Sequence, residues 1–253
     1  MLKSFGISGR ECEAELELLR TGLDFGKVDW FYGEENPDDF KVIYEGRTSV
    51  LMHSSGKRIT GAEHLSAAML LFSGCCFKLN VPQRELPLLD GSAGLWEKEL
   101  EKAGGIKNNS LPFYSVPEKE FEIKMDERFV KFKKTDENCL EIKYSIDRFG
   151  QKFWADAKIN SSKDLEKILL ARTYIFEEEL QSAGLSENLR GCGIILGKEK
   201  NNLLFENEPA FHKILDFLGD ITLRRGVLPR GRFEIFNGGH ELHHLVLERI
   251  TPA

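Results

Sequence analysis

The segment Asn207-Glu208-Pro209-Ala210-Phe211-His212-Lys213-Ile214-Leu215-Asp216-Phe217-Leu218-Gly219-Asp220 predicts a single buried helix with a polar border. Pro209 suits the first turn of a helix, where its missing N–H would have no partner in any case. Apolar side chains recur with the spacing of a buried stripe at Phe211, Ile214, Leu215 and Leu218. Because a helix turns by about 100° per residue, a polar row follows one edge of this stripe, formed by His212, Asp216 and Asp220.

This polar row has two interpretations that spacing alone leaves open. A histidine and an aspartate four residues apart lie on one helix face and are able to share a metal ion. The alternative is an ordinary amphipathic helix whose histidine and acids are solvated, the common outcome for motifs this short. Other segments of the chain have to decide between them.

A second histidine, His64, lies in the first turn of a helix predicted over residues 61–73. The apolar face of this helix is formed by Leu65, Met69 and Phe72. Glu63, directly before His64, also has two interpretations. With Thr60 it fits a capping box that closes the helix N-terminus, and beside a metal-binding histidine it serves as a general base.

Two shorter segments contribute a third histidine and a hydroxyl group. Phe236-Asn237-Gly238-Gly239-His240 places a histidine after a diglycine that allows a tight backbone approach. Ala171-Arg172-Thr173-Tyr174 places a hydroxyl and an aromatic ring directly after a predicted helix. Neither segment predicts a function alone.

In this order and with these spacings, the segments closely resemble the zinc-dependent UDP-3-O-acyl-N-acetylglucosamine deacetylases of lipid A biosynthesis. The resemblance covers most of the chain from about Gly56 onward. The residues that carry it are Glu63-His64-Leu65, Glu85-Leu86-Pro87-Leu88-Leu89-Asp90-Gly91-Ser92-Ala93, Ala171-Arg172-Thr173, Asn207-Glu208-Pro209 through His212-Lys213 to Gly219-Asp220, and Gly238-Gly239-His240.

Carried over residue by residue, the resemblance implies a catalytic zinc centre. Its metal ligands are expected to be His64, His212 and Asp216. The catalytic groups are expected to be the general base Glu63, the catalytic histidine His240, its orienting partner Asp220 and the transition-state hydrogen-bond donor Thr173. Two imidazoles and one carboxylate leave a fourth zinc position open, which is the pattern of catalytic sites. Whether the base or the catalytic histidine protonates the departing amine stays open.

The resemblance also implies how the substrate, an acylated UDP-N-acetylglucosamine, is bound. Lys213 and Tyr174 are expected near it, and an insert over residues 176–200 is expected to form a hydrophobic passage for the acyl chain. The expected apolar contributors to this passage are Leu180, Leu185, Leu189 and Ile194. A surface hairpin with its own small core is the alternative for the insert.

The chain departs from the family pattern outside the catalytic set. Residues 5–10 lack the histidine usual there, Ser186-Glu187-Asn188-Leu189-Arg190 replaces the usual Gly-Gly-Ser of the insert, and Tyr174 replaces a phenylalanine. These differences concern how the nucleotide sugar is bound and which acyl length is preferred. They indicate either a divergent member of the family or a paralogue.

Four arginines lie between the predicted metal helix and His240 in a chain that is otherwise acidic: Arg224, Arg225, Arg230 and Arg232. A solvated basic loop is one interpretation. The other is diphosphate binding, because a planar guanidinium holds a pair of phosphate oxygens well. We predict that at least one of the four contacts the substrate diphosphate, with Arg230 and Arg232 as the main candidates.

Composition narrows the class of protein. The chain has 253 residues, 41% of them hydrophobic, which is enough for compact cores. The net charge of −6 disfavours a general binder of nucleic acid or anionic membranes. No apolar run approaches the roughly 18 residues of a membrane span, and no signal peptide is evident, so a cytoplasmic location is expected. A monomer is expected as well. The five cysteines lack paired spacing and are expected to be buried thiols.

The pattern of elements predicts an α+β fold. Strand-like alternation covers residues 11–19 and 41–52, and helices follow at 61–73 and 94–103. After a linker-like segment at 104–118 come strands near 120–123, 129–133 and 140–146, a helix at 163–170, the metal helix, a strand at 232–236 and a helix at 241–250. The resemblance implies two similar α+β sandwiches, residues 1–112 and 113–253, with the active site between their helix layers.

Three functions are compatible with these features. The first is zinc-dependent removal of the N-acetyl group from UDP-3-O-(3-hydroxyacyl)-N-acetylglucosamine. The second is a related zinc deacetylase acting on another N-acetyl sugar, and the third is a catalytically silent regulatory paralogue. The complete set of base, ligands and catalytic histidine argues against the third, because a pure binding role needs no carboxylate beside an open zinc position.

Overall fold

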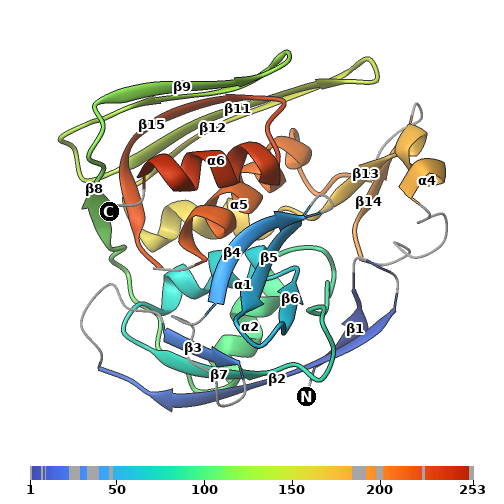
Figure 1. Ribbon diagram of the computed structural model, residues 1–253, viewed down its shortest axis with the longest axis vertical. Coiled ribbons are helices and arrows are strands. Elements are labelled where there is room, and N and C mark those ends of the chain that lie inside the picture. Colours follow the sequence, from blue (N-terminus) through green and yellow to red (C-terminus); the bar gives the residue numbers. More distant parts are fainter. Residues whose placement is uncertain are drawn as a thin grey trace.

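The computed structural model describes residues 2–6, 8, 10–22, 29–32, 40–45, 48–183, 192–197, 202–223 and 226–250. Two sheets lie on opposite sides of the molecule with helices between them (Figure 1). No helix within these ranges is long and apolar enough to cross a membrane. The chain therefore has the predicted α+β class, with strands and helices in separate layers.

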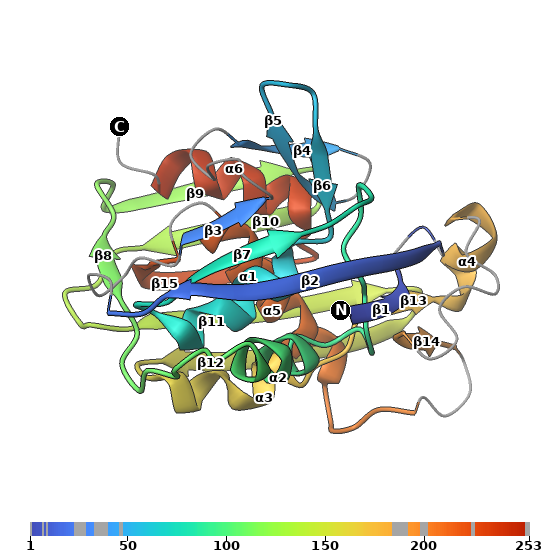
Figure 2. The same cartoon turned by 90° about the horizontal axis from the view of Figure 1, so that it is seen from below.

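The first sheet is built by the N-terminal part of the chain. In spatial order its strands are β1 (Leu2–Phe5), β2 (Glu11–Arg20), β7 (Cys76–Asn80) and β3 (Asp29–Tyr32). Figure 2 shows this sheet from below with its two helices, α1 (Glu63–Met69), which a 3-10 turn extends through Leu70–Phe72, and α2 (Gly94–Lys102). Sheet and helices share a core of fully buried side chains that includes Leu65, Phe72, Phe77, Leu79 and Trp96.

Residues 41–52, predicted as one strand-like stretch, form two antiparallel strands instead. These are β4 (Phe40–Glu45) and β5 (Thr48–His53), and β6 (Arg58–Thr60) pairs with β5. A hairpin pairs the backbone N–H and C=O groups of its own strands, which side-chain alternation along the sequence does not reveal. β5 also packs against helix α6 (His240–Ile250), so this small sheet reaches the second half of the chain.

The second sheet is built by the C-terminal part of the chain. In spatial order its strands are β12 (Gln151–Ile159), β11 (Leu140–Arg148), β15 (Leu228–Phe236), β10 (Arg128–Lys133) and β9 (Glu120–Met125). β11 and β15 are parallel, and the other neighbours on this path are antiparallel.

Two strands of this half correct the sequence-based prediction. The edge strand β12 was not predicted, because its inward positions include the small residues Ala155 and Ala157 while Trp154 faces outward and is exposed. β8 (Phe113–Ser115) lies in the segment predicted as a linker, and it exists through pairing with the distant β15. The predicted domain boundary between residues 112 and 113 stays a prediction.

Helix α5 (Glu208–Thr222) is the central element and corresponds to the predicted metal helix. It is buried on nearly every side and packs against α1, α6 and α3 (Glu166–Leu169). Gly219 makes the contact with α1 possible, because an added Cβ would lie 2.1 Å from the carbonyl oxygen of Glu63. The helix layers of the two sandwiches therefore meet where α1 begins.

The predicted insert is described in part. It comprises β13 (Tyr174–Phe176), α4 (Glu177–Ala183) and β14 (Ile194–Leu196), and β14 pairs parallel with β13. Leu185 and Leu189 lie outside the described residues. The parallel pairing brings the end of the insert back beside Tyr174.

All five cysteines are free and buried, as their unpaired spacing predicted. Cys75 and Cys76 lie where the apolar helical segment ends and β7 begins. The fold is therefore held by its apolar cores and not by disulfide bonds.

We expect Gly219→Ala to destabilise the protein, since the added methyl group meets the backbone of Glu63 and not a flexible side chain. Overpacking of this kind costs about 1–3 kcal/mol, to be measured as a fall in the free energy of unfolding in urea. Gly239→Ala is the matched control, because a Cβ there meets nothing within 4 Å. Equal stability of the two variants would show that α1 and α5 can move apart enough to accommodate the added methyl group.

Candidate active site

The three predicted metal ligands converge between α1 and α5. Nε2 of His64 lies 3.4 Å and Nε2 of His212 lies 3.3 Å from Oδ1 of Asp216. The two imidazole rings meet edge to face with their centroids 5.1 Å apart. All three side chains are buried, and their ligand atoms lie within 4.8 Å of one another. Two imidazole nitrogens and one carboxylate oxygen form a donor set that fits a divalent metal ion in a catalytic site.

His212 is held in the orientation and charge state that metal binding requires. Its Nδ1 lies 3.2 Å from the carbonyl oxygen of Ala171, so this nitrogen donates and Nε2 is left for the site. Burial lowers the pKa of His212 to about 3, which keeps the ring neutral. Burial opposes the charge on Asp216, but the charge of Lys213 and the hydrogen bond to His64 hold the pKa of that carboxyl well below its usual value. A neutral imidazole and an ionised carboxylate are the forms that bind a metal.

Glu63 is the first residue of α1 and does not cap it. The N-cap is Ala62, and no side chain makes a capping hydrogen bond there, so the capping-box interpretation is wrong. The Glu63 side chain is buried at the cavity, and its Oε2 has no hydrogen-bond partner among the described residues. Burial raises the pKa of Glu63 above its usual value, although His240 and His64 act in the opposite direction. This makes the carboxylate a stronger base than an exposed glutamate.

His240, the first residue of α6, pairs with Asp220 of α5 through an Nδ1 to Oδ2 distance of 2.8 Å. Burial alone would lower the pKa of His240, but the charge of Asp220 and their hydrogen bond raise it to about 9. Burial likewise opposes the charge of Asp220, and interaction with His240 holds its pKa at about 2. The structure therefore brings the two together as an imidazolium and a carboxylate at neutral pH.

Thr173 is fixed by backbone contacts from two loops. Its N–H donates to the carbonyl oxygen of Gly91 at 2.7 Å, and its own carbonyl accepts from the N–H of Ile194 at 2.8 Å. A Cβ added at either Gly91 or Gly193 would lie 2.8 Å from the Thr173 methyl group. The segment before α2, which contributed to the resemblance, thus helps to fix Thr173 in the lining of the cavity.

A buried ion pair ties the Thr173 segment to the metal helix. Arg172 donates from Nε to Oε1 of Glu208 at 2.9 Å and from Nη2 to Oε2 at 3.2 Å. Glu208 is the first residue of α5 and is 0% exposed. Because Ala171 also accepts from His212, residues 171–173 and α5 form one rigid unit.

Lys213 and Tyr174, the two predicted neighbours of the substrate, both line the cavity. Nζ of Lys213 lies 2.8 Å from Oδ2 of Asp216 and 5.4 Å from the centre of the Tyr174 ring. Burial would lower the pKa of Lys213, but the charge of Asp216 raises it, so the ammonium group persists. Burial raises the pKa of Tyr174 to about 12, so its hydroxyl stays protonated.

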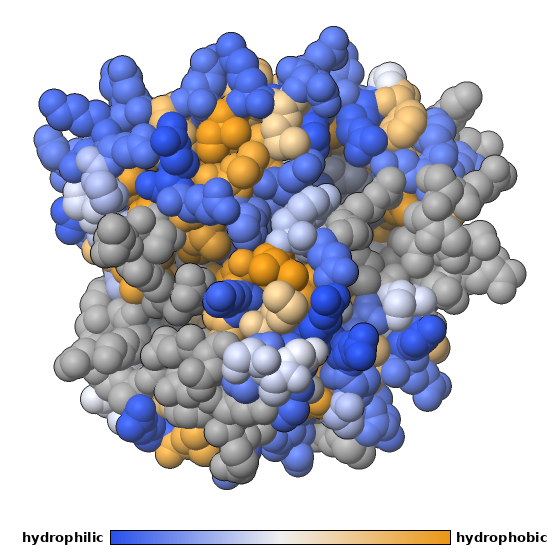
Figure 3. Space-filling view, viewed as in Figure 1, coloured by the Kyte–Doolittle hydropathy of each residue, from blue (hydrophilic) through white to orange (hydrophobic). Residues whose placement is uncertain are grey.

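One cavity of about 1310 Å³ is lined by residues of both sandwiches, among them Glu63, His64, Thr173, Tyr174, Lys213, Asp216 and His240. On the face of the molecule in Figure 3, polar side chains dominate and apolar ones gather near α6 and β4. The lining also includes residues that no spacing signal marked, among them Arg128, Arg148, Phe149, Phe176 and Glu241. Arg128, Arg148 and Phe176 lie at strand ends, Phe149 lies in the turn after β11, and Glu241 follows His240 in the first turn of α6.

Several predicted substrate contacts are not brought to this cavity. Among the described residues, its lining does not include Leu180 or Ile194, and Ile194 is buried in the small β13–β14 sheet. Arg230 and Arg232 do not line it either, and Arg232 forms an ion pair with Glu141 at 2.9 Å. Arg224 and Arg225 lie outside the described residues. The apolar wall near the insert is formed by Phe149, Ile175 and Phe176.

A family model described as UDP-3-O-acyl N-acetylglycosamine deacetylase matches residues 6–252. The chain belongs to this family. It is 30% identical over 243 residues to the UDP-3-O-acyl-N-acetylglucosamine deacetylase of Aquifex aeolicus, covering 91% of this chain and 82% of the relative. Identity to the deacetylase of Nautilia profundicola is 29%, covering 91% and 81%. Identity to that of Helicobacter pylori is also 29%, covering 82% and 73%.

In this member of the deacetylase family, we expect His212→Ala to weaken retention of a divalent metal by more than about tenfold, since even the loss of an outer partner of a ligand costs that much. Elemental analysis of metal per chain after gel filtration measures this. His244→Ala is the control, because His244 hydrogen-bonds the carbonyl oxygen of Val42 and lies outside the cluster. Full occupancy in the His212 variant would remove this residue from the ligand set.

Proposed function

We propose that this protein is a zinc-dependent hydrolase that removes the N-acetyl group from UDP-3-O-(3-hydroxyacyl)-N-acetylglucosamine in lipid A biosynthesis. One observation carries the proposal. Two histidines and an aspartate able to hold a metal ion, a buried glutamate with an unpartnered oxygen and a histidine paired with an aspartate lie together at one cavity in a chain of the deacetylase family. The expected cytoplasmic location and monomeric state belong to the same proposal.

The donor set supports zinc as the metal. Imidazole nitrogen is a borderline ligand and carboxylate oxygen is a hard one, and zinc accepts both. Three such ligands leave a fourth position for water or substrate. When bound by His64, His212 and Asp216, zinc supplies Lewis-acid chemistry that polarises the acetyl carbonyl and lowers the pKa of water.

Glu63 acts as the general base. Its carboxylate lies at the cavity, and Oε2 is free to accept a proton from the attacking water. Because its pKa is raised by burial, the proton transfer is more favourable than with an exposed glutamate. The same geometry allows the protonated Glu63 to return a proton later in the reaction.

His240 and Thr173 act on the negative charge that develops on the acetyl oxygen. The His240 imidazolium, kept charged by Asp220, faces the cavity from α6, and the Thr173 hydroxyl faces it from the segment before β13. Preorganised donors of this kind stabilise a tetrahedral oxyanion. Protonation of the departing amine falls to His240 or to the newly protonated Glu63.

The cavity also suggests how the two ends of the substrate are held. Phe149, Ile175 and Phe176 offer an apolar wall to the acyl chain. For the diphosphate, strand register favours Arg128, because Phe129 pairs with Phe236 and Arg128 therefore lies beside the turn that leads to His240. Arg232 lies four residues before Phe236 on β15, which corresponds to about 13 Å at the rise per residue of a β-strand.

We expect Glu63→Gln to retain zinc and to lose at least on the order of 10²-fold in deacetylation rate, the scale of general acid–base groups. The wild-type rate should follow a bell-shaped pH profile. Activity falls at low pH as Glu63 is protonated through its raised pKa, and at high pH as His240 loses its proton near pH 9. Acetate release from the acylated and the unacylated UDP-sugar is the measurement.

Three results would contradict the proposal. A near-normal rate in the Glu63 variant would show that another group is the base. Equal turnover of the unacylated sugar would favour a related deacetylase of different substrate range. Absence of turnover in the zinc-loaded wild type would favour a silent paralogue.

We expect Arg128→Gln to raise KM with little change in kcat, which is the sign of lost uniform binding. Arg230→Gln and Arg232→Gln are compared in the same assay. A change in KM confined to these two variants would show that residues of β15 bind the diphosphate and that Arg128 does not. Because Arg128 is paired with Glu241 at 3.2 Å, Glu241→Gln tests whether the ion pair or the cation itself sets KM.

A further inference from the structure

His243 of α6 is fully buried, and it has no role in the proposed deacetylation. Its Nδ1 lies 2.7 Å from Oδ2 of Asp220, the same oxygen that lies 2.8 Å from Nδ1 of His240. His240 and His243 are three residues apart on one helix, so both rings face α5 from the first turn of α6. One carboxylate oxygen of Asp220 therefore accepts from two histidines.

The hydrogen-bond pattern fixes the tautomer of His243. Ionised Asp220 is an acceptor only, so Nδ1 of His243 carries the proton. Nε2 of His243 lies 3.3 Å from the hydroxyl of Tyr144, and burial raises the pKa of that hydroxyl well above its usual value. The hydroxyl thus donates to Nε2. Burial also lowers the pKa of His243, which agrees with a neutral ring that donates at one nitrogen and accepts at the other.

The second oxygen of Asp220 is held from another direction. Oγ of Ser49 on β5 donates to Oδ1 at 2.6 Å. Ser49 and His243 thus hold the two carboxylate oxygens from β5 and α6, and neither side chain lines the cavity. His240, the third donor, does line it. The orientation of the carboxylate is therefore set from behind the site.

This arrangement matters because the last torsion of an aspartate has a broad energy well. A carboxylate held by one fewer donor turns more freely, and the His240 ring that hydrogen-bonds to it turns with it. Catalytic groups lose rate when their geometry loosens, even with substrate binding unchanged. Partners one step removed from the chemistry typically change activity by about 10–100-fold when they are lost.

We propose that His243 is a positioning residue, which donates from Nδ1 to Asp220, fixes that carboxylate together with Ser49, and thereby sets the orientation of His240. Its effect on turnover rests on the proposed function, since His240 must act in deacetylation for its orientation to matter. The hydrogen-bond geometry itself does not depend on that function.

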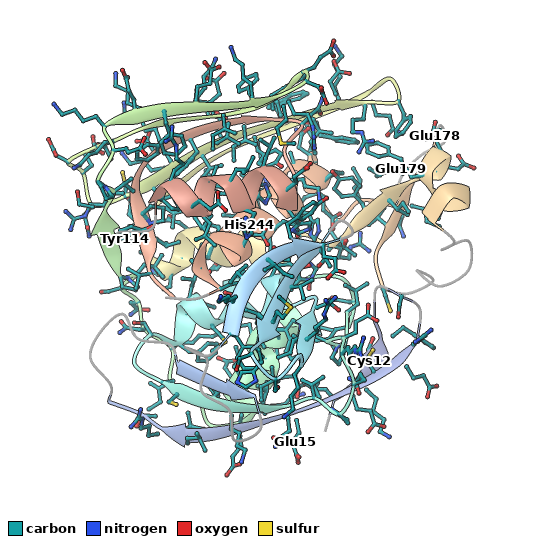
Figure 4. All side chains as sticks on the ribbon, viewed as in Figure 1. Cys12, Glu15, Tyr114, Glu178, Glu179 and His244 are labelled. Carbon is teal, nitrogen blue, oxygen red and sulfur yellow. The ribbon has the colours of Figure 1, made fainter. Side chains whose placement is uncertain are left out.

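The test compares four variants of the full-length, zinc-loaded protein. His243→Leu removes the donor. His243→Asn keeps an amide N–H at the place of Nδ1, and His243→Gln moves it toward the place of Nε2. The neighbouring His244 is half-buried on α6 and donates to the carbonyl oxygen of Val42, so His244→Leu is the matched control (Figure 4).

We expect kcat to fall by about 10–100-fold in the Leu and Gln variants of His243, with KM and zinc content unchanged. The Asn variant and His244→Leu should keep kcat within a few-fold of the wild type. Equal losses in the Asn and Gln variants, or as large a loss in His244→Leu, would overturn the proposal. If the Leu variant does not fold, the contrast between Asn and Gln decides alone.

A second measurement does not depend on turnover. The proton on Nδ1 of His240 is shared with a carboxylate and should give a low-field NMR signal, which His240→Gln assigns by its absence. We expect this signal to be preserved in His243→Asn and shifted or broadened in His243→Gln. An identical signal in both would reject the positioning role, whereas a silent wild-type enzyme with the expected signals would reject only the deacetylase function.

Discussion

The close contact of α1 with α5 is the constraint on which the site depends. A Cβ at Gly219 would lie 2.1 Å from the carbonyl oxygen of Glu63, so the two helices approach as closely as backbones allow. Glu63 and His64 begin α1, and His212 and Asp216 project from α5. The proposed base and His64 therefore come from one sandwich, and His212 and Asp216 come from the other, so neither half forms the centre without the other. Packing density between the helix layers thus determines catalytic geometry directly.

Burial of acids in this interface gives the site its chemical asymmetry. A buried carboxylate costs several kcal/mol unless it is paired, and Asp216 and Asp220 are both paired, with Lys213 and with His240. Their pKa values are lowered as a result. Glu63 keeps an unpartnered oxygen, and its pKa is raised. Neighbouring carboxyl groups whose pKa values move in opposite directions indicate which one exchanges protons and which one only orients charge.

The sequence predicted the parts of the structure that local physics determines. Periodicity with Pro209 in the first turn predicted α5, which extends from Glu208 to Thr222. β8 was not predicted because it exists through pairing with a distant strand. β12 was not predicted because its alternation between apolar and polar residues is weak. In the site, spacing and resemblance predicted a set of residues that the structure brings together, namely Glu63, His64, His212 and Asp216, and their roles as base and ligands stay predictions. Ser49 of β5 and Tyr144 of β11 reach the site only through tertiary contacts, and no local sequence pattern marks either residue. The three-residue spacing of His240 and His243, in contrast, is a sequence pattern that places both on one face of a helix.

The diglycine before His240 shows how a sequence feature gains its meaning only in three dimensions. Its two members were expected to allow a tight backbone approach, and the structure assigns that need to one of them. A Cβ at Gly238 would lie 2.5 Å from the Tyr144 hydroxyl, whereas a Cβ at Gly239 would meet nothing within 4 Å. The Tyr144 hydroxyl therefore contacts both the turn that leads to His240 and the ring of His243. The turn and the buried histidine share one support on β11, so the path of the backbone and the orientation of the Asp220 carboxylate are set together.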